Sequence, residues 1–372
     1  MGTDKPAALG GAGLFSKVID WWIPCVSAHF PCWAGMGATV IPSVASAHEV
    51  YVLPPSIVAQ AIATPAFSEW NTILTNAGQF SFWGFITALI ILIVFFVSIS
   101  RRLEHILDPL LQKLPPYAPV ISRITIGLSF LSAAYHNSLF GPELPLLATF
   151  GGASTFVKAS LVVIGVLLTI GWCTRTAALA ALSLFVIEIC AHGVYMLTYT
   201  NYFGELLLLL VLGADLIAFR KEDRSILHAP PWTLRMKTTL TPYAFPILRV
   251  AFGISLLYAS IYAKVIHNNL ALDVAYRYPS LIHFFGFEPH FLVVGAAIIE
   301  ILIGLFFILG IEIRFTALFL LFWLSLSLWY FGEAVWPHVI LIGIPIAFIF
   351  YGYDTYSLEG YFFKRSDSEP VL

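Results

Sequence analysis

A single carboxylate interrupts the apolar stretch GAAIIEILIGLFFILG at residues 295–310. An ionised carboxylate at the centre of a membrane-spanning helix costs about 2.5–3.5 kcal/mol on insertion scales. We therefore expect Glu300 to face other helices and to be protonated or paired. Two interpretations stay open: Glu300 accepts protons beside a bound substrate, or it makes one interhelical hydrogen bond that fixes the packing. Gly304, one turn later, favours close approach of a second helix.

A second pair of residues that could do chemistry lies in FVIEICAHGVY, at 185–195. Glu188 and His192 are four residues apart, so they share one face of a helix. Such a pair can relay protons or supply two ligands to a metal ion. The alternative is a plain structural pair, and the spacing alone does not choose between these roles.

The composition indicates what kind of protein holds these residues. The chain of 372 residues is 59% hydrophobic and 11% charged, whereas soluble globular proteins carry roughly 25% charged residues. Repeated apolar stretches of about 18 or more residues are typical of membrane-spanning helices. We predict an all-α, polytopic membrane protein whose surroundings are a lipid bilayer. The net charge of −2 indicates no nucleic-acid partner, and there is no phosphate-binding glycine loop, nucleotide fingerprint or CxxC pair.

Hydropathy predicts about nine transmembrane helices. They cover residues 80–99, 119–139, 155–173, 176–197, 202–219, 244–266, 290–311, 315–332 and 336–352. If the Arg101–Arg102 pair is cytoplasmic, 14 Lys and Arg residues lie inside and three lie outside, namely Lys158, Lys264 and Arg277. This asymmetry follows the positive-inside rule. We expect a multi-pass protein of the cell membrane with a cytoplasmic C-terminus.

The segments outside the spans are assigned from composition. Residues 1–47 are predicted to be a signal peptide or an uncleaved signal anchor, because a moderately apolar stretch ends in the small-x-small pattern Ala45-Ser46-Ala47. We further expect a short extracytoplasmic segment at 48–79, and a leading membrane helix followed by an interfacial helix at 80–118. A cytoplasmic linker is expected at 221–243 and a disordered cytoplasmic tail at 354–372.

Under this topology seven of the ten histidines lie outside the membrane or in its outer half: His48, His136, His192, His267, His283, His290 and His338. This distribution favours an outward-facing site for a metal ion or a polar substrate. The candidate metal ligands are His48, His136, His192 and His338. His48 would become the N-terminus after cleavage at Ala47, where its amine and imidazole could chelate copper together. The alternative is that outer loops simply hold polar residues.

The membrane-spanning part of the chain contains an internal repeat. ISRITIGLSFLSA at 121–133 matches ILRVAFGISLLYA at 247–259 with an offset of 126, and IGVLLTIGWCTRTAAL at 164–179 matches IGLFFILGIEIRFTAL at 303–318 with an offset of 139. Equal residues include Arg123 and Arg249, Gly127 and Gly253, Gly165 and Gly304, Gly171 and Gly310, and Arg175 and Arg314. Each copy holds four predicted spans, so the copies at 119–220 and 244–353 should be parallel repeats related by an axis along the membrane normal.

The repeated motif resembles that of the DoxX family. In the second copy it reads E-x-x-x-G-x-x-x-x-x-G-x-x-x-R, at Glu300, Gly304, Gly310 and Arg314. The resemblance covers about 119–352 and implies a tandem pair of DoxX-like four-helix units behind one leading helix. Leu161 stands in the first copy where the second has Glu300, so a role of that carboxylate is retained only once.

The resemblance implies a function, because DoxX-like proteins include the membrane subunit of a thiosulfate:quinone oxidoreductase. Quinone is then the expected cofactor, and the candidate catalytic groups are Glu300, Glu188 and His192. The candidates for binding a quinone or a headgroup are Glu300, Gly304, Arg314 and Arg175. The two arginines are also expected to anchor the topology at inner helix ends. A soluble redox partner subunit would hold the donor site, since no haem, flavin or iron–sulfur motif is present.

Two other classes of function stay open. Parallel repeats with polar groups inside the membrane would suit a transporter of a small solute or a metal, with its site at the repeat interface. Distant relatives of the family act as secretory cargo receptors, so a non-catalytic membrane scaffold or receptor is the third hypothesis. A neighbouring gene for a soluble redox subunit would favour electron transfer, and uptake by the protein expressed alone would favour transport.

Overall fold

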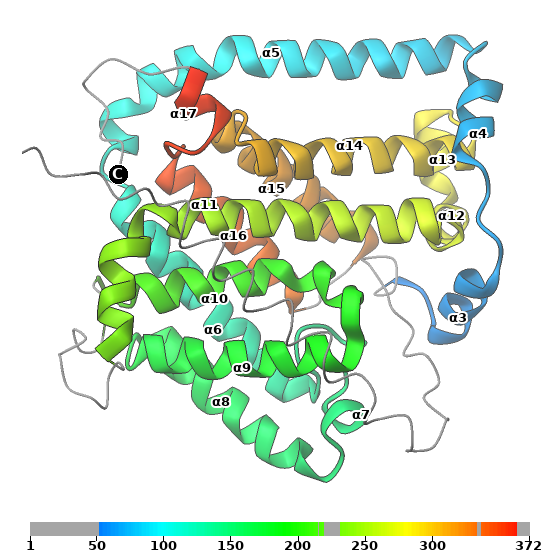
Figure 1. Ribbon diagram of the computed structural model, residues 1–372. Helices are drawn as coiled ribbons and strands as arrows, with labels where there is room; N and C mark the ends of the chain where they lie inside the picture. Colours follow the sequence, from blue (N-terminus) through cyan, green and yellow to red (C-terminus); the bar gives the residue numbers. More distant parts are fainter. Residues whose placement is uncertain (1–51, 215, 219–230, 333–335, 363–372) are drawn as a thin grey trace, which may run out of the picture. The chain divides into compact units, whose positions relative to one another are not determined.

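The computed structural model describes residues 52–214, 216–218, 231–332 and 336–362. Every described residue belongs to one compact unit of the chain, Val44–Leu372. Within the described ranges the chain forms helices and no β-strand (Figure 1), so the prediction of an all-α protein is confirmed. The predicted signal segment, residues 1–47, lies outside the described residues.

The described helices have the following bounds, in chain order: α3 (Pro55–Ala63), α4 (Glu69–Asn76), α5 (Phe80–Leu111), η1 (Pro115–Tyr117), α6 (Ala118–His136), α7 (Leu146–Phe150), η2 (Gly151–Ala153), α8 (Ser154–Ile170), α9 (Thr174–His192), η3 (Gly193–Tyr199), α10 (Thr200–Leu212), α11 (Pro231–Ile261), η4 (Tyr262–Ile266), α12 (Asn269–Arg277), α13 (Pro279–Phe285), α14 (Pro289–Leu309), α15 (Ile313–Phe331), α16 (Pro337–Tyr351) and α17 (Leu358–Phe362).

Among the described residues, seven helical segments are long and apolar enough to cross a membrane by length and composition. One of them, Thr174–Leu212, joins α9, η3 and α10 and so covers two of the predicted spans. The last predicted span corresponds to α16, which is apolar but only 15 residues long. The protein is therefore an integral, multi-pass membrane protein, while the count of nine spans stays a prediction.

The leading helix α5 is longer than expected. It runs through 32 residues to Leu111, so the separate interfacial helix predicted after the first span is wrong: those residues extend α5. The reason is that no glycine or proline interrupts residues 85–108. Aromatic rings join α5 to the other helices, with Phe85 against Phe291 and Phe96 against Phe319.

Helices α6, α8, α9 and α10 form the first four-helix unit, and α11, α14, α15 and α16 form the second. In the first unit α6 packs on α8, where a Cβ added to Gly165 would lie 2.8 Å from the carbonyl oxygen of Gly127. In the second unit α11 packs on α14, where a Cβ added to Gly253 would lie 2.6 Å from the carbonyl oxygen of Gly304. The same pair of glycines thus allows close helix approach in both units.

The two units also pack crosswise on one another. Helix α10 lies against α11, where a Cβ on Gly204 would be 2.7 Å from Cβ of Ala251. Helix α16 lies against α6, where a Cβ on Gly343 would be 2.6 Å from Cβ of Thr125. The offsets of the sequence repeat relate the two contacts: Gly343 lies 139 positions after Gly204, and Thr125 lies 126 positions before Ala251. This reciprocal packing supports the predicted tandem repeat.

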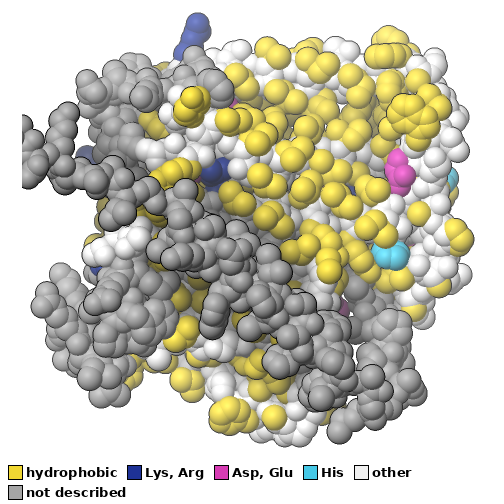
Figure 2. Space-filling model, in the orientation of Figure 1, with side chains coloured by type: hydrophobic (Ala, Val, Ile, Leu, Met, Phe, Trp, Pro, Cys, Tyr) yellow, Lys and Arg dark blue, Asp and Glu magenta, His cyan; other side chains and the backbone are white. Residues whose placement is uncertain are grey.

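The ends of the two units differ in their charged side chains. One end, which we call the arginine end, is where the repeated arginines donate to carbonyl oxygens in or just after the last turns of other helices. These residues are Arg123, Arg175, Arg249 and Arg314. The opposite end, where α6, α9, η4 and α15 finish, is the histidine end. On the face drawn in Figure 2 apolar side chains predominate, with the largest visible Lys and Arg side chains on the left and the larger acidic and histidine ones on the right.

Two further boundaries correct the predictions. The first helix of the second unit, α11, begins at Pro231 and contains Pro242 and Pro246. Most of the expected linker at 221–243 is therefore helical. The expected disordered tail is ordered from residue 354 to 362, where it forms α17 and buried contacts. The prediction failed there because Asp354 is held by a residue 105 positions away in sequence. Residues 363–372 lie outside the described range.

Candidate functional site

Glu300 forms an ion pair with Lys264. Nζ of Lys264 lies 2.9 Å from Oε2 of Glu300, and the side chains are 8% and 22% exposed. Both residues lie in segments that can cross a membrane, Lys237–Ile266 and Pro289–Leu309. A charge inside a membrane protein is stabilised by such a partner, so the pair explains how the chain holds a carboxylate in an apolar helix.

Helix packing brings this pair together. Gly304 lies one turn from Glu300 on the same face of α14, and that face meets Gly253 and Leu257 of α11. A Cβ added to Gly304 would lie 3.0 Å from the carbonyl oxygen of Gly253. The place of Gly304 is therefore explained by packing: it lets α11 and α14 approach closely enough for Lys264 to reach Glu300.

Lys264 lies in η4, a single turn of π-helix that follows α11. The N–H of His267 donates to the carbonyl oxygen of Tyr262 at 2.9 Å and closes this wide turn. Such turns insert one extra residue into a helix and are frequent at functional sites. In the first unit, by the offsets of the repeat, Ser138 and Leu161 stand where the second has Lys264 and Glu300, so this ion pair belongs to the second unit alone.

Residues 52–76 cover part of the histidine end next to this turn; we call them the cap. The side chain of Asn268 accepts from the N–H of Phe67 at 3.1 Å, and it donates to the carbonyl oxygen of Phe67 and to Glu69. Asn269 donates to the carbonyl oxygens of Thr64 and Pro65. Burial lowers the pKa of the adjacent His267, partly offset by a backbone hydrogen bond at Ile62. These hydrogen bonds thus tie the cap to the loop that follows η4.

Glu188 and His192 are paired, as their spacing predicts. Nε2 of His192 lies 3.0 Å from Oε2 of Glu188, whose side chain is fully buried. The hydroxyl of Thr149 lies 3.4 Å from the same carboxylate oxygen and 3.3 Å from the same ring nitrogen. Oε1 of Glu188 is buried and has no hydrogen-bond partner among the described residues.

A third carboxylate, Glu143, lies in the loop between α6 and α7. Its Oε1 accepts a hydrogen bond from the hydroxyl of Tyr195 at 2.7 Å and another from the hydroxyl of Tyr199. Its Oε2 is buried without a hydrogen-bond partner in the described part of the chain. Burial raises the pKa of Glu143, whereas the hydrogen bonds from Tyr199 and Tyr195 and the charge of His192 act in the opposite direction.

An aromatic contact links the two units at this level. The ring of Tyr195 lies 5.9 Å from the ring of Tyr262 in η4, and Tyr262 lies 4.7 Å from the ring of His267. Tyr195 therefore contacts Glu143 through its hydroxyl and the second unit through its ring. This ring contact joins the two units at the histidine end.

The predicted metal ligands are not gathered. His136 stacks on Trp336 with ring centroids 4.7 Å apart, His192 bonds Glu188, and His338 is buried in α16. No three His, Cys, Asp or Glu side chains of the described ranges are close enough together to hold a metal ion. His48 lies outside these ranges, so the copper site predicted there stays a prediction.

The two arginines expected to bind a headgroup are engaged at helix ends. The guanidinium of Arg175 is buried and donates to the carbonyl oxygens of Val211 and Leu212 at 3.4 and 3.1 Å. Nε of Arg314 donates to the carbonyl oxygen of Ile349 at 3.1 Å. Each arginine satisfies carbonyl groups that a helix C-terminus leaves without partners. The geometry matches the anchoring role, and headgroup binding stays a prediction.

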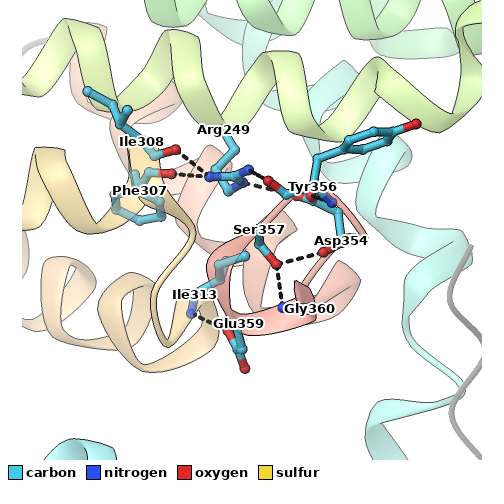
Figure 3. A network of polar contacts seen from close by, with 9 residues as sticks. All are labelled: Arg249, Phe307, Ile308, Ile313, Asp354, Tyr356, Ser357, Glu359 and Gly360. Atoms are coloured by element: carbon cyan, nitrogen blue, oxygen red, sulfur yellow. Dashed lines mark hydrogen bonds and ion pairs between the residues drawn. The ribbon is translucent and has the colours of Figure 1, made fainter. Parts of the chain in front are cut away.

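A denser network surrounds Arg249 (Figure 3). Its Nε donates to Oδ2 of Asp354 at 2.9 Å, and both side chains are buried. Its Nη1 donates to the carbonyl oxygens of Phe307 and Ile308 at the end of α14. Ser357 and Glu359 complete the turn, with Glu359 accepting from the N–H of Ile313 at 3.1 Å. All the neutralising partners come from this chain, so the network is a structural site.

Comparison with known families gives one match. Residues 244–333 match the DoxX family model. This segment is DoxX-like. The match confirms the resemblance within the second unit, while the likeness of the first unit stays a prediction. The chain matches no curated protein and no solved structure.

The DoxX-like segment contains Lys264 and Glu300 but none of the polar residues of the first unit. Sequence reasoning identified Glu300 and did not identify its partner, because the π-turn that places Lys264 opposite Glu300 leaves no recognisable pattern. It also missed Glu143, a loop residue distant in sequence from both tyrosines. The available signal was that Tyr195 and Tyr199 are four residues apart, with Tyr195 three residues after His192.

Proposed function

We propose that the protein is the integral membrane subunit of a quinone-linked electron-transfer system, and that it binds quinone beside Lys264 and Glu300. The observation that carries the proposal is the ion pair itself: a lysine and a partly exposed glutamate, 2.9 Å apart, within helices that can cross a membrane. Membership of both residues in the DoxX-like segment supports it. Intramembrane ionisable groups of this kind commonly mark sites of proton or substrate chemistry.

The two side chains fit the two forms of the ligand. The Lys264 ammonium can donate a hydrogen bond to a quinone carbonyl oxygen, and the Glu300 carboxylate can accept a proton from a quinol hydroxyl. Reduction of a quinone to a quinol takes up two electrons and two protons. The electrons would come from a soluble partner subunit that carries the donor site, and Glu300 would exchange protons at the bound ring.

The test is quinone binding by the purified protein in mild detergent. Extraction of co-purifying quinone and titration with a fluorescent quinol analogue would be done on wild type, Glu300→Gln and Lys264→Met. Glu205→Gln is the matched control, because Glu205 is also a glutamate within an apolar helix but is fully buried and belongs to the first unit. We expect stoichiometric binding that weakens about tenfold or more in the first two variants and stays at the wild-type level in the control.

Absence of quinone binding by well-folded wild type would reject this function. A transporter of a small solute is the second candidate, favoured by the contact of Tyr195 with Tyr262, which places polar groups where the two units meet. Uptake of a solute by vesicles that contain only this protein would support that alternative. A protein with neither activity would be a membrane scaffold or receptor.

A further inference from the structure

A second group of polar residues lies at the histidine end of the first unit, outside the DoxX-like segment. It consists of Glu143, its tyrosine donors and the Glu188–His192 pair. We infer that Glu143 holds an exchangeable proton on its Oε2 atom, so that this group is a proton-binding site separate from the Lys264–Glu300 pair. The inference does not depend on quinone binding, and its test reads the Glu143 carboxyl group directly.

The loop that carries Glu143 folds the carboxyl group inward. A Cβ added to Gly141 would lie 2.6 and 2.8 Å from the two carboxylate oxygens of Glu143, so the carboxyl group packs directly over the glycine backbone. The hydroxyl of Tyr202 donates to the carbonyl oxygen of Phe140 at 3.1 Å and fixes the same loop to α10. The position of the carboxyl group is therefore determined by the fold.

The hydrogen bonds indicate which oxygen carries the proton. Oε1 accepts from two tyrosine hydroxyls, as a carbonyl oxygen of a carboxylic acid can. Oε2 is buried and has no donor among the described residues. An ionised oxygen buried without a donor is costly, and a proton on Oε2 removes that cost while both tyrosine bonds remain.

Burial agrees with this assignment, whereas the charge of His192 acts against it. Burial raises the pKa of Glu143, and no cationic side chain among the described residues forms an ion pair with it. The titratable groups around it are Tyr195 and Tyr199 of η3, Glu188 and His192 of α9, and Tyr202 of α10, with Tyr262 of η4 behind Tyr195. Lys158 donates instead to the side chain of Asn137 at 2.8 Å.

The exchange step is a proton transfer that conserves charge. Glu143 loses the proton from Oε2 and becomes a carboxylate, which the hydroxyls of Tyr195 and Tyr199 stabilise through Oε1. A water molecule accepts the proton, so no charge is created or lost.

The test is infrared spectroscopy of the whole protein in detergent, which distinguishes a protonated carboxyl group from a carboxylate. Wild type would be titrated across the neutral range beside Glu143→Gln and, as the matched control, Glu188→Gln. Glutamine replaces a protonated glutamic acid with little change of shape, so Glu143→Gln is expected to fold. We expect a carboxylic-acid band at neutral pH that shifts in heavy water, disappears in Glu143→Gln and persists in Glu188→Gln.

A further variant examines the hydrogen bonds. Tyr199→Phe removes one donor to the ionised form, so the midpoint of the band should move to higher pH by about 1 unit. Three results would overturn the inference: an ionised Glu143 throughout the neutral range, a band that belongs to Glu188, or a band abolished at constant pH when sodium replaces choline in the buffer. The last result would make the group a sodium site.

Discussion

At the arginine end the two four-helix units share several contacts, whereas at the histidine end they carry different polar groups. Nη2 of Arg123 donates to the carbonyl oxygen of Ile217, and Nη2 of Arg249 donates to that of Tyr356, 139 positions later. Arg175 and Arg314 likewise donate to the last carbonyls of α10 and α16. The arginine end therefore repeats from one unit to the other in its hydrogen bonds as well as its sequence.

The histidine end shows no such repetition. In the first unit Glu143 lies in a short loop and accepts hydrogen bonds from two tyrosines of η3. The second unit has the Lys264–Glu300 pair, next to a longer loop that is hydrogen-bonded to the cap. Contacts that recur in both units are those that any copy of the fold needs, and contacts found in one unit only are free to serve a function. The comparison indicates that the arginine end maintains the fold, and it favours our proposal that the histidine end carries the chemistry.

The largest expected effect is at the arginine end. Arg249→Met leaves Asp354 buried without its partner, and breaking a buried ion pair from one side costs about 3–5 kcal/mol. We expect a large drop in the thermal unfolding temperature of the detergent-solubilised protein. Arg102→Met is the control, because Arg102 is exposed on α5. Equal melting of the two variants would contradict a structural role for the arginine end.

A smaller loss of stability is expected where the helices of each unit cross. Gly253→Ala places a Cβ 2.6 Å from the carbonyl oxygen of Gly304, and overpacking of this kind costs about 1–3 kcal/mol. Gly127→Ala should cost a similar amount in the first unit. Gly84→Ala on α5 is the control, since no described atom lies within 4 Å of the added carbon. Equivalent packing would be contradicted if the unfolding temperatures of the Gly253→Ala and Gly127→Ala variants differed from each other, or if both matched that of the control.

At the histidine end the ion pair should affect binding more than stability. In a double-mutant cycle of Lys264→Met and Glu300→Gln, we expect the effects on quinol-analogue affinity to be non-additive by about 1.4 kcal/mol, a factor of ten. The reason is that each side chain positions the other at the ligand. Strictly additive effects would show that the two residues act independently, and the proposed shared site would then be wrong.

The smallest effect is expected at the cap. Asn268→Ala removes the hydrogen bonds that join residues 67–69 to the loop after η4, and each neutral bond contributes about 0.5–1.5 kcal/mol. Limited proteolysis should cut residues 52–79 faster in this variant, while the unfolding temperature of the helices changes little. Unchanged proteolysis would show that the apolar contacts of Leu53 and Val58 suffice to hold the cap.

The fold was predictable wherever one apolar face or one repeat decided the structure. Hydropathy located each of the membrane helices, and the offsets of 126 and 139 anticipated the glycine contacts of both units. The start of α11 was missed because the polar composition of residues 221–243 was assigned to a linker, although α11 begins at Pro231 and continues through Pro242 and Pro246. The ordered tail was missed because its partner Arg249 lies far away in sequence.

The candidate site was predictable only where its residues share one helix. Glu188 and His192 were identified from their spacing, and Glu300 from its apolar surroundings. Lys264 and Glu143 were not, since a π-turn and a loop position them and neither leaves a periodic pattern. Their contacts depend on tertiary packing, which short-range sequence patterns do not contain.

The most direct measurement of the central claim is photolabelling with a photoreactive quinone analogue, followed by peptide mapping of the wild-type protein. If chemistry lies at the histidine end of the second unit, the label should appear in η4 and α14, near Lys264 and Glu300, and be lost with excess unlabelled quinone. Glu300→Gln should reduce it about tenfold at the same concentration. Competable labelling confined to the arginine end would contradict the account.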